Sequence, residues 1–322
     1  MKKVYSAVKL PQEAIDILED NEIELTMHDE LTTPSEDEII EKVKDVDALI
    51  SGVNVEVTSK VIEANENMKI IANIGAGTNN LDIDKAEEKG IVVSKTPGRD
   101  SVASTAELAI GLMLAVSRNI LKNQDMVNEN SFDGWQVMGF LGSHQVSYKN
   151  LLIIGFGNIG QEIAKMAKAF HMDINYYDIK DRSEFKEAEE ETSAKYVELE
   201  EGLKNADYVI LQMNYTDENY HFIDKDKLSL MKEDAYLINT ARGDVLDEEV
   251  LADYLEEGKL AGAGLDVHEN EPKMNERLIK MDKAVLTPHI GNDTYEARVE
   301  MSKAAAEEVV RALNGDEVKY KG

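Results

Sequence analysis

The chain has 322 residues, of which 43% are hydrophobic and 31% charged, so it is long enough for two ordinary globular domains. Its formal net charge of −29 disfavours nucleic acid and anionic membrane surfaces as partners. The chain contains no cysteine, which excludes disulfides, thiolate nucleophiles and cysteine metal sites.

Targeting and metal-binding signals are also absent from the sequence pattern. Residues 1–10 lack a long apolar run and a small-residue cleavage site, and no later window approaches eighteen apolar residues. We therefore expect no signal peptide, no transmembrane helix and a cytoplasmic location. The spacing of the histidines does not form a metal-ligand pattern, so we expect no metal.

The first hundred residues alternate short apolar runs with amphipathic stretches, which indicates a parallel sheet covered by helices. Strands are predicted at Val4–Leu10, Glu22–Met27, Ala48–Gly52, Lys69–Ile74 and Ile91–Ser94. Helices are predicted at Gln12–Glu19, Ser35–Val43, Ser59–Glu66 and Ile83–Lys89. A longer periodic segment then predicts one extended helix from about Ser104 to Val127.

The alternation of strands and helices resumes at residue 151 and continues almost to the end of the chain. Strands are predicted at Leu151–Ile154, Asp173–Tyr177, Tyr208–Met213, Ala235–Asn239, Gly262–Val267 and Ala284–Leu286. A closing helix from about Thr294 to Leu313 is followed by Asn314-Gly315, a typical helix end.

Two such α/β units, with a long helix at each junction, suggest that the second is inserted into the first. We predict two doubly wound parallel-sheet lobes of the α/β class, a Rossmann lobe inserted into a flavodoxin-like substrate lobe. The substrate domain comprises residues 1–102 and 291–322, and the dinucleotide-binding domain comprises residues 103–290.

A glycine motif follows the strand that begins at Leu151. Gly155 allows a tight turn, Gly157 lets the backbone approach a pyrophosphate, and Gly160 lets the next helix pack closely. Asp178 ends the following strand, where it can accept hydrogen bonds from a ribose 2′-hydroxyl and repel a 2′-phosphate. This pattern predicts NAD rather than NADP, although Lys180 and Arg182 lie nearby. The alternative is a structural turn with an incidental carboxylate.

Three further polar residues follow predicted strands of the same lobe: Arg242, Glu271 and His289. An arginine can bind a carboxylate through two hydrogen bonds, and a histidine beside a carboxylate can donate and accept a proton near neutral pH. With a nicotinamide, these groups suffice to reduce a 2-oxo acid. Taken singly, each could instead be an ion-pair partner, a solvated turn residue or a packed loop histidine. Among the other histidines, His268 stands out, because it lies three residues before Glu271.

Four motifs, in this order, resemble those of the D-isomer-specific 2-hydroxyacid dehydrogenases, over residues 48 to 313. They are Gly155-Phe156-Gly157-Asn158-Ile159-Gly160, Asn239-Thr240-Ala241-Arg242-Gly243, Gly264-Leu265-Asp266-Val267 through Glu271-Pro272, and Thr287-Pro288-His289-Ile290-Gly291. The resemblance implies that Arg242 binds the substrate carboxylate, that His289 is the acid/base, and that Glu271 tunes His289.

The same resemblance implies further contacts. Cofactor contacts are implied for Asn158 and Ile159 at the pyrophosphate, Asp266 at the nicotinamide amide, and Thr240, Ala241 and Thr105. The loop Gly75–Asp82 resembles a family loop whose backbone N–H groups bind the substrate carboxylate, here at Ala76 and Gly77. The family also implies a homodimer joined through the nucleotide lobes. The chain departs from the family at Gln212-Met213-Asn214, where His-x-Pro is common, and at Asn158, where arginine is frequent.

The substrate depends on the N-terminal pocket around Ser51–Val55, which contains no cation. We therefore expect a small unphosphorylated 2-oxo acid, such as glyoxylate, hydroxypyruvate, pyruvate or a short branched acid. A 3-phosphoglycerate dehydrogenase-like activity stays open, because Lys9, Lys95 or Arg99 could supply a cation. Two rival interpretations are a non-enzymatic NAD-sensing regulatory protein and a formate dehydrogenase. The complete set of Arg242, Glu271 and His289 argues against the regulatory protein. Glu271 argues against a formate dehydrogenase, because that branch resembles a version of the motif with glutamine at this position.

Overall fold

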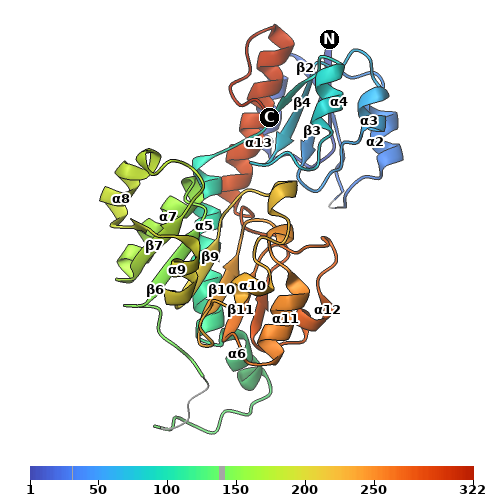
Figure 1. Ribbon diagram of the computed structural model, residues 1–322. Coiled ribbons are helices and arrows are strands. Elements are labelled where there is room, and N and C mark those ends of the chain that lie inside the picture. Colours follow the sequence, from blue (N-terminus) through green and yellow to red (C-terminus); the bar gives the residue numbers. More distant parts are fainter. Residues whose placement is uncertain (31, 138–141) are drawn as a thin grey trace. The chain divides into compact units, whose positions relative to one another are not determined.

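A computed structural model describes residues 1–30, 32–137 and 142–322. The chain divides into two compact units (Figure 1). Unit 1 comprises Met1–Ser101 and Asn292–Gly322, and unit 2 comprises Val102–Gly291.

Unit 1 contains a parallel sheet in the order β2-β1-β3-β4-β5, the strand order of flavodoxin-like folds. Its strands are β1 (Lys2–Ser6), β2 (Ile23–Met27), β3 (Ala48–Gly52), β4 (Ile70–Ile74) and β5 (Val92–Ser94). Its helices are α1 (Gln12–Glu19), α2 (Glu36–Val43), α3 (Ser59–Glu63), α4 (Ile83–Glu88) and α13 (Tyr295–Asn314).

Both faces of this sheet are buried, because successive strand residues point to opposite sides. Ile50 packs in one cluster with α1 and α13, whereas its neighbour Leu49 packs in another with α2, α3 and α4. The helix α13 contacts β3 and β4, so the C-terminal segment completes a unit that the first hundred residues begin (Figure 1).

Unit 2 contains a parallel sheet in the order β12-β11-β10-β9-β6-β7-β8. Counted from β6, this is the Rossmann order 3-2-1-4-5-6 with one more strand. Its strands are β6 (Asn150–Ile154), β7 (Asp173–Tyr177), β8 (Lys195–Tyr196), β9 (Tyr208–Leu211), β10 (Tyr236–Asn239), β11 (Gly262–Leu265) and β12 (Ala284–Leu286). Its α-helices are most of α5 (Arg99–Ser117), then α6 (Ile120–Asn128), α7 (Asn158–Ala169), α8 (Lys186–Thr192), α9 (Leu199–Asn205), α10 (Lys225–Leu228), α11 (Glu248–Glu256) and α12 (Glu276–Ile279). Short 3₁₀ turns are η1 (Arg182–Phe185), η2 (Asp217–Asn219) and η3 (Gly243–Val245).

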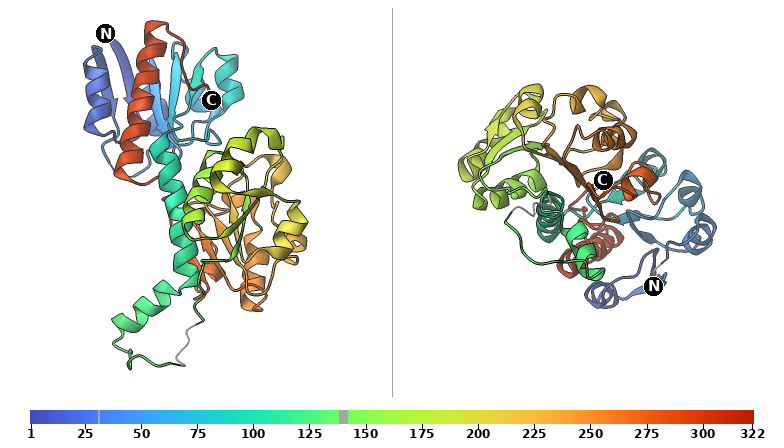
Figure 2. Two further views of the ribbon diagram at one scale, coloured as in Figure 1. Left: turned by 90° about the vertical axis from the view of Figure 1, so that its left-hand side faces the viewer. Right: turned by 90° about the horizontal axis from the view of Figure 1, so that it is seen from below.

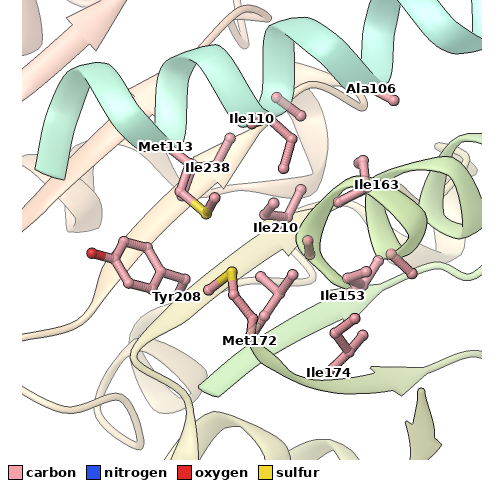
Figure 3. Close-up of a cluster of buried hydrophobic side chains, with 14 of the residues drawn as sticks. Ala106, Ile110, Met113, Ile153, Ile163, Met172, Ile174, Tyr208, Ile210 and Ile238 are labelled. Carbon is pink, nitrogen blue, oxygen red and sulfur yellow. The ribbon is translucent and has the colours of Figure 1, made fainter. Parts of the chain in front are cut away.

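The core of unit 2 follows the same alternation. Figure 3 shows Ile153, Ile210 and Ile238 from three strands packing with residues of α5 and α7 on one face of the sheet. On the other face, Leu152 and Leu237 belong to a cluster that includes residues of α9, α10 and α11. The two predicted doubly wound parallel-sheet lobes are therefore confirmed.

The prediction of one extended helix at Ser104–Val127 is wrong. The segment forms two helices, α5 and α6, separated at Asn119, whose φ of 49° lies in the left-handed region. Asparagine tolerates this conformation better than most residues, and a left-handed residue ends an α-helix. The apolar pattern does not reveal the break, because it continues into α6. No strand was predicted at β8, and no helices were predicted at α9 to α12.

Among the described residues, only the helix α5 is long and apolar enough, by length and composition, to cross a membrane. This differs from the prediction that no segment of the chain is apolar enough for a transmembrane helix. Half of its apolar window is buried, and Ala106, Ala109 and Met113 are fully buried in the core of unit 2 (Figures 2 and 3). These contacts are those of the core helix of a globular unit.

Candidate active site

The glycine turn after β6 is built so closely that two of its glycines leave no space for a side chain. Gly155 has φ of +95°, and a Cβ there would lie 2.5 Å from the Gln212 carbonyl oxygen. A Cβ on Gly160 would lie 2.3 Å from the Gly155 carbonyl oxygen. A Cβ on Gly157, by contrast, would meet no described atom within 4 Å. Gly155 and Gly160 are thus required by the turn itself, while Gly157 borders open space.

The N-terminus of α7 opens at this turn. Gly157 is the N-cap residue, and no described side chain caps the helix. The first turn, which includes Asn158 and Ile159, also contains no acidic residue. Unpaired backbone N–H groups and the positive end of the helix dipole suit an anion such as a pyrophosphate.

Asp178, directly after β7, is held beside the glycine turn. Its carboxylate accepts hydrogen bonds from the Phe156 N–H at 2.7 Å and from the Lys180 N–H at 2.9 Å. The two nearby cations have carboxylate partners of their own: Lys180 lies 3.9 Å from Glu184, and Arg182 lies 2.8 Å from Glu189. Each cation therefore already has a carboxylate partner, which argues against a site for a 2′-phosphate.

Thr240 and Ala241 follow β10, and the Gln212 side-chain amide donates a hydrogen bond to the Thr240 hydroxyl. This bond gives Gln212 a role in the site that its departure from the family motif did not predict. Asn239 shapes the same turn, because its side chain accepts from the Ala241 N–H at 3.0 Å and donates to the Arg242 carbonyl at 2.9 Å.

Asp266, after β11, organises the turn that follows β12. Its buried carboxylate accepts from the Thr287 hydroxyl at 2.6 Å and from the N–H groups of Ile290 and Gly291, each at 2.8 Å. Thr105 of α5 lies against the same place, since a Cβ on Gly291 would be 3.3 Å from its methyl group. The structure thus brings Thr105, Asp266 and the turn at residues 287–291 together.

His289 lies at the centre of this turn in a left-handed conformation, with φ of 54°. Its N–H donates to the Asp266 carbonyl at 2.8 Å, and its Nδ1 lies 2.8 Å from Oε2 of Glu271. An ionised carboxylate can only accept, so Nδ1 carries the proton and Nε2 is left for another partner. Left-handed backbone in a residue with a Cβ costs energy and is found mostly where it is fixed by its surroundings.

Two hydrogen bonds hold the Glu271 carboxylate. Oε2 pairs with His289, and Oε1 accepts from the His268 N–H at 3.0 Å. Burial by itself raises the pKa of Glu271, but these hydrogen bonds and the two histidine charges outweigh burial and hold that pKa below its usual value. The lowered pKa favours the ionised form of the Glu271 carboxylate, which accepts the Nδ1–H of His289.

Arg242 begins the turn η3 and is partly buried. Its Nη1 donates to the Ala241 carbonyl at 2.7 Å, and no carboxylate of the described residues lies within 4 Å of the guanidinium. Burial lowers the pKa of Arg242, while the charges of Glu271 and Asp244 oppose that shift. Because arginine stays charged in proteins, this arrangement favours binding of a further anion.

Ala76 and Gly77 belong to unit 1, in the loop after β4. Asn73 donates from Nδ2 to the Gly77 carbonyl at 2.9 Å and accepts from the Ser51 hydroxyl at 2.9 Å, and the Gly75 N–H donates to the Thr96 hydroxyl at 2.9 Å. Sequence reasoning missed this buried polar network, because an isolated asparagine in a strand gives no signal of its partners.

Comparisons with known proteins identify the family to which the chain is similar. Residues 110–291 match the family model of the D-isomer specific 2-hydroxyacid dehydrogenase, NAD binding domain. A protein of Staphylococcus haemolyticus, named as a candidate 2-hydroxyacid dehydrogenase, is 44% identical over 316 residues, which are 98% of each chain.

Two solved structures of enzymes are similar over nearly the whole chain. A glyoxylate reductase from Paecilomyes thermophila has a TM-score of 0.87 at 29% identity and covers 99% of this chain and 98% of its own. A D-lactate dehydrogenase from Aquifex aeolicus, solved with NAD and lactic acid, has a TM-score of 0.81 at 26% identity and covers 98% and 96%.

The open space at Gly157 leads to a testable prediction. Gly157→Ala should fold with an unchanged melting temperature, because its Cβ meets no described atom, yet weaken NADH binding at least about tenfold by blocking the pyrophosphate. Isothermal titration and thermal unfolding measure the two effects. The matched control is Gly160→Ala, which should lower the melting temperature in addition to weakening NADH binding. Unchanged NADH affinity in Gly157→Ala would contradict the phosphate site.

Proposed function

Because the chain belongs to the D-isomer-specific 2-hydroxyacid dehydrogenase family, we propose that it interconverts a small, unphosphorylated D-2-hydroxy acid and its 2-oxo acid. The predicted family, the class of NAD-dependent dehydrogenase and the cofactor NAD are confirmed by this membership. The observation that carries the proposal is the Glu271–His289 pair, whose Oε2 and Nδ1 lie 2.8 Å apart. Arg242, which follows the neighbouring strand β10, interacts with the charge of Glu271 and has no carboxylate within 4 Å among the described residues.

Arg242 binds the substrate carboxylate in this proposal. A carboxylate would supply the anion that the partly buried guanidinium lacks, and arginine can hold it through two hydrogen bonds. In unit 1, Asn73 and Thr96 hold the loop of Ala76 and Gly77, whose N–H groups the family resemblance assigns to carboxylate binding. Fixing the carboxylate orients the adjacent carbonyl for reduction.

His289 moves the proton. Its Nε2 donates to the carbonyl oxygen during reduction and accepts the hydroxyl proton during oxidation, and ionised Glu271 stabilises the charged ring in both directions. Bound nicotinamide supplies or accepts the hydride. Asn158 and Ile159 would hold its pyrophosphate and Asp178 its ribose, and Thr240, Ala241, Thr105 and Asp266 would line the rest of its site.

The proposal of an unphosphorylated substrate depends on the lack of cations near Ser51–Val55. The segment Ser51–Val55 contains none, and Lys9, one of the basic residues that could have replaced them, pairs with Asp29 at 2.7 Å. Gly75 is crowded as well, since a Cβ there would lie 2.3 Å from a methyl group of Val53. Glyoxylate, hydroxypyruvate, pyruvate or a short branched 2-oxo acid fits these limits, and the similar glyoxylate reductase and D-lactate dehydrogenase support that range.

A panel of 2-oxo acids, assayed by NADH consumption, tests the proposed function. We expect turnover of at least one small unphosphorylated acid and none of 3-phosphohydroxypyruvate. His289→Ala should lose about 10²–10⁴-fold in kcat while keeping its NADH affinity, because it removes the proton donor alone. Turnover of the phosphorylated acid alone would instead indicate the 3-phosphoglycerate dehydrogenase-like activity. NADH binding without turnover of any acid would favour the NAD-sensing regulatory protein.

The preference for NAD depends on Asp178. Replacing it with alanine removes the acceptor for the ribose hydroxyls and the repulsion of a 2′-phosphate, so the ratio of NADH to NADPH affinity should fall about tenfold or more. Fluorescence titration with each cofactor measures the ratio. The control is Asp181→Ala, at an exposed residue three positions further along the chain, which should leave the ratio of NADH to NADPH affinity unchanged. Equal losses for both cofactors in Asp178→Ala would contradict the ribose contact.

We also propose that the protein is a cytoplasmic homodimer. Exposed apolar side chains gather on α6 and the segment that follows it, which extends from the rest of unit 2 (Figure 2). They are Ile120, Leu121, Val127, Phe132, Trp135 and Val137, each at least half exposed. A second copy of the chain is the proposed partner for this patch, because large apolar groups exposed together mark protein interfaces.

Sedimentation velocity tests the dimer. Placing a charge in the patch with Leu121→Glu should shift the protein to a monomer at micromolar concentration, because the carboxylate would be buried without a partner. Ile279→Glu is the matched control, since this isoleucine of α12 is equally exposed, at 56%, outside the patch. A monomeric wild-type protein would refute the homodimer.

A further inference from the structure

His268 contacts each of the three elements to which the proposed function assigns chemistry. Its N–H donates to Glu271, and its Nε2 lies 3.0 Å from the Thr287 carbonyl, two residues before His289. Its backbone also lies against the turn that Arg242 begins, because a Cβ on Gly243 would be 2.0 Å from the His268 carbonyl carbon.

The second ring nitrogen of His268 faces a carboxylate. Nδ1 lies 3.7 Å from Oε1 of Glu248, which is beyond hydrogen-bond range but within ion-pair range, and the two side chains are 1% and 4% exposed. Nδ1 has no hydrogen-bond partner among the described residues. Glu248 is fixed in turn, because Oε1 accepts from the Glu269 N–H at 3.1 Å. Both side chains are buried, so water does not separate or screen this pair.

The surroundings favour a charged ring. A carbonyl oxygen can only accept a hydrogen bond, so Nε2 carries a proton in the bond to Thr287. Burial by itself lowers the pKa of His268, but the Glu248 carboxylate, the Thr287 carbonyl and the charge of Glu271 together raise it above its usual value. These surroundings therefore favour the protonated form of His268 more than those of an ordinary exposed histidine do.

We propose that His268 is a positioning residue for the reaction: its ring, packed against Glu248, fixes the Thr287 carbonyl at the start of the His289 turn, and its backbone N–H holds the Glu271 carboxylate. This inference rests on the proposed function of Glu271 and His289. It adds a second histidine–glutamate pair behind the first, joined to it by the His268 N–H.

The charge of His268 interacts with two carboxylates, Glu248 of α11 and Glu271 in its own loop. Glu269 lies in the same loop, Arg242 and Asp244 lie at the turn η3, and His289 is paired with Glu271. A positive charge beside the Glu271–His289 pair makes release of the shared proton easier. Without it, the pair keeps its proton to higher pH.

Two substitutions separate position from charge. His268→Phe keeps the ring volume and removes both the hydrogen bond and the charge, whereas His268→Gln keeps an N–H for the Thr287 carbonyl and removes the charge alone. We expect kcat to fall about tenfold in His268→Phe and to stay within about threefold of wild type in His268→Gln. In both variants the alkaline limb of the pH profile of kcat should move to higher pH, with NADH affinity unchanged.

The matched control is His171→Gln, since His171 is an exposed histidine two residues before the N-terminal end of β7, away from the site. It should leave kcat and the pH profile unchanged. Wild-type kcat and pH profile in His268→Phe would overturn the inference. Equal loss of kcat in the Phe and Gln variants, with an unmoved alkaline limb, would overturn it as well.

A stability measurement tests the His268–Glu248 pair without relying on activity. A histidine whose pKa is raised in the folded state stabilises the protein fully below its unfolded pKa, and this contribution is lost as pH rises through the folded value. The free energy of unfolding of wild type should therefore fall from about pH 6.5 upward relative to that of His268→Gln. A constant difference across that range would overturn the inference even if the wild-type enzyme is active. A wild-type protein that shows this fall but reduces no 2-oxo acid would count against the proposed function alone.

Discussion

Parallel strand pairing in unit 2 is the constraint on which the candidate site depends. Parallel strands place all their carboxyl ends at one edge of the sheet, and the residues of the site follow β6, β7, β10, β11 and β12 in turn. Groups that are up to 134 positions apart in the chain, from Gly155 to His289, thus share one edge. The order of strands reverses between β6 and β9, which opens the place where α/β sheets bind ligands.

Close packing of the backbone makes this edge possible. Gly155 lets the turn after β6 approach the backbone of Gln212 after β9, and Gly160 lets α7 approach the Gly155 carbonyl, within distances that a methyl group would prevent. Gly243 does the same for the turn beside His268. Where the backbone is this crowded, its N–H groups are directed by the fold and need no flexible side chain to place them. Asp178 and Asp266 then use those N–H groups to fix two turns of the site.

Charge in the site is balanced within short distances. Each buried carboxylate meets an N–H group or a histidine, and Glu271 and Glu248 each do both. Arg242 is the exception, since no carboxylate among the described residues lies within 4 Å of it. In a partly buried region this imbalance favours an anionic ligand, which is consistent with an acid as substrate.

The sequence alone determined the α/β class, most strand positions and the family, because buried parallel strands are continuous apolar runs and glycine motifs reflect local backbone needs. It did not determine the break at Asn119, where the apolar pattern continues through a left-handed residue. It also could not pair Asn73 with Ser51, Gln212 with Thr240 or His268 with Glu248. The glycine turn could be read from the chain because its geometry is local. The partners of buried polar side chains were decided only by the tertiary structure, since residues far apart in the chain meet there and nothing in their spacing records it.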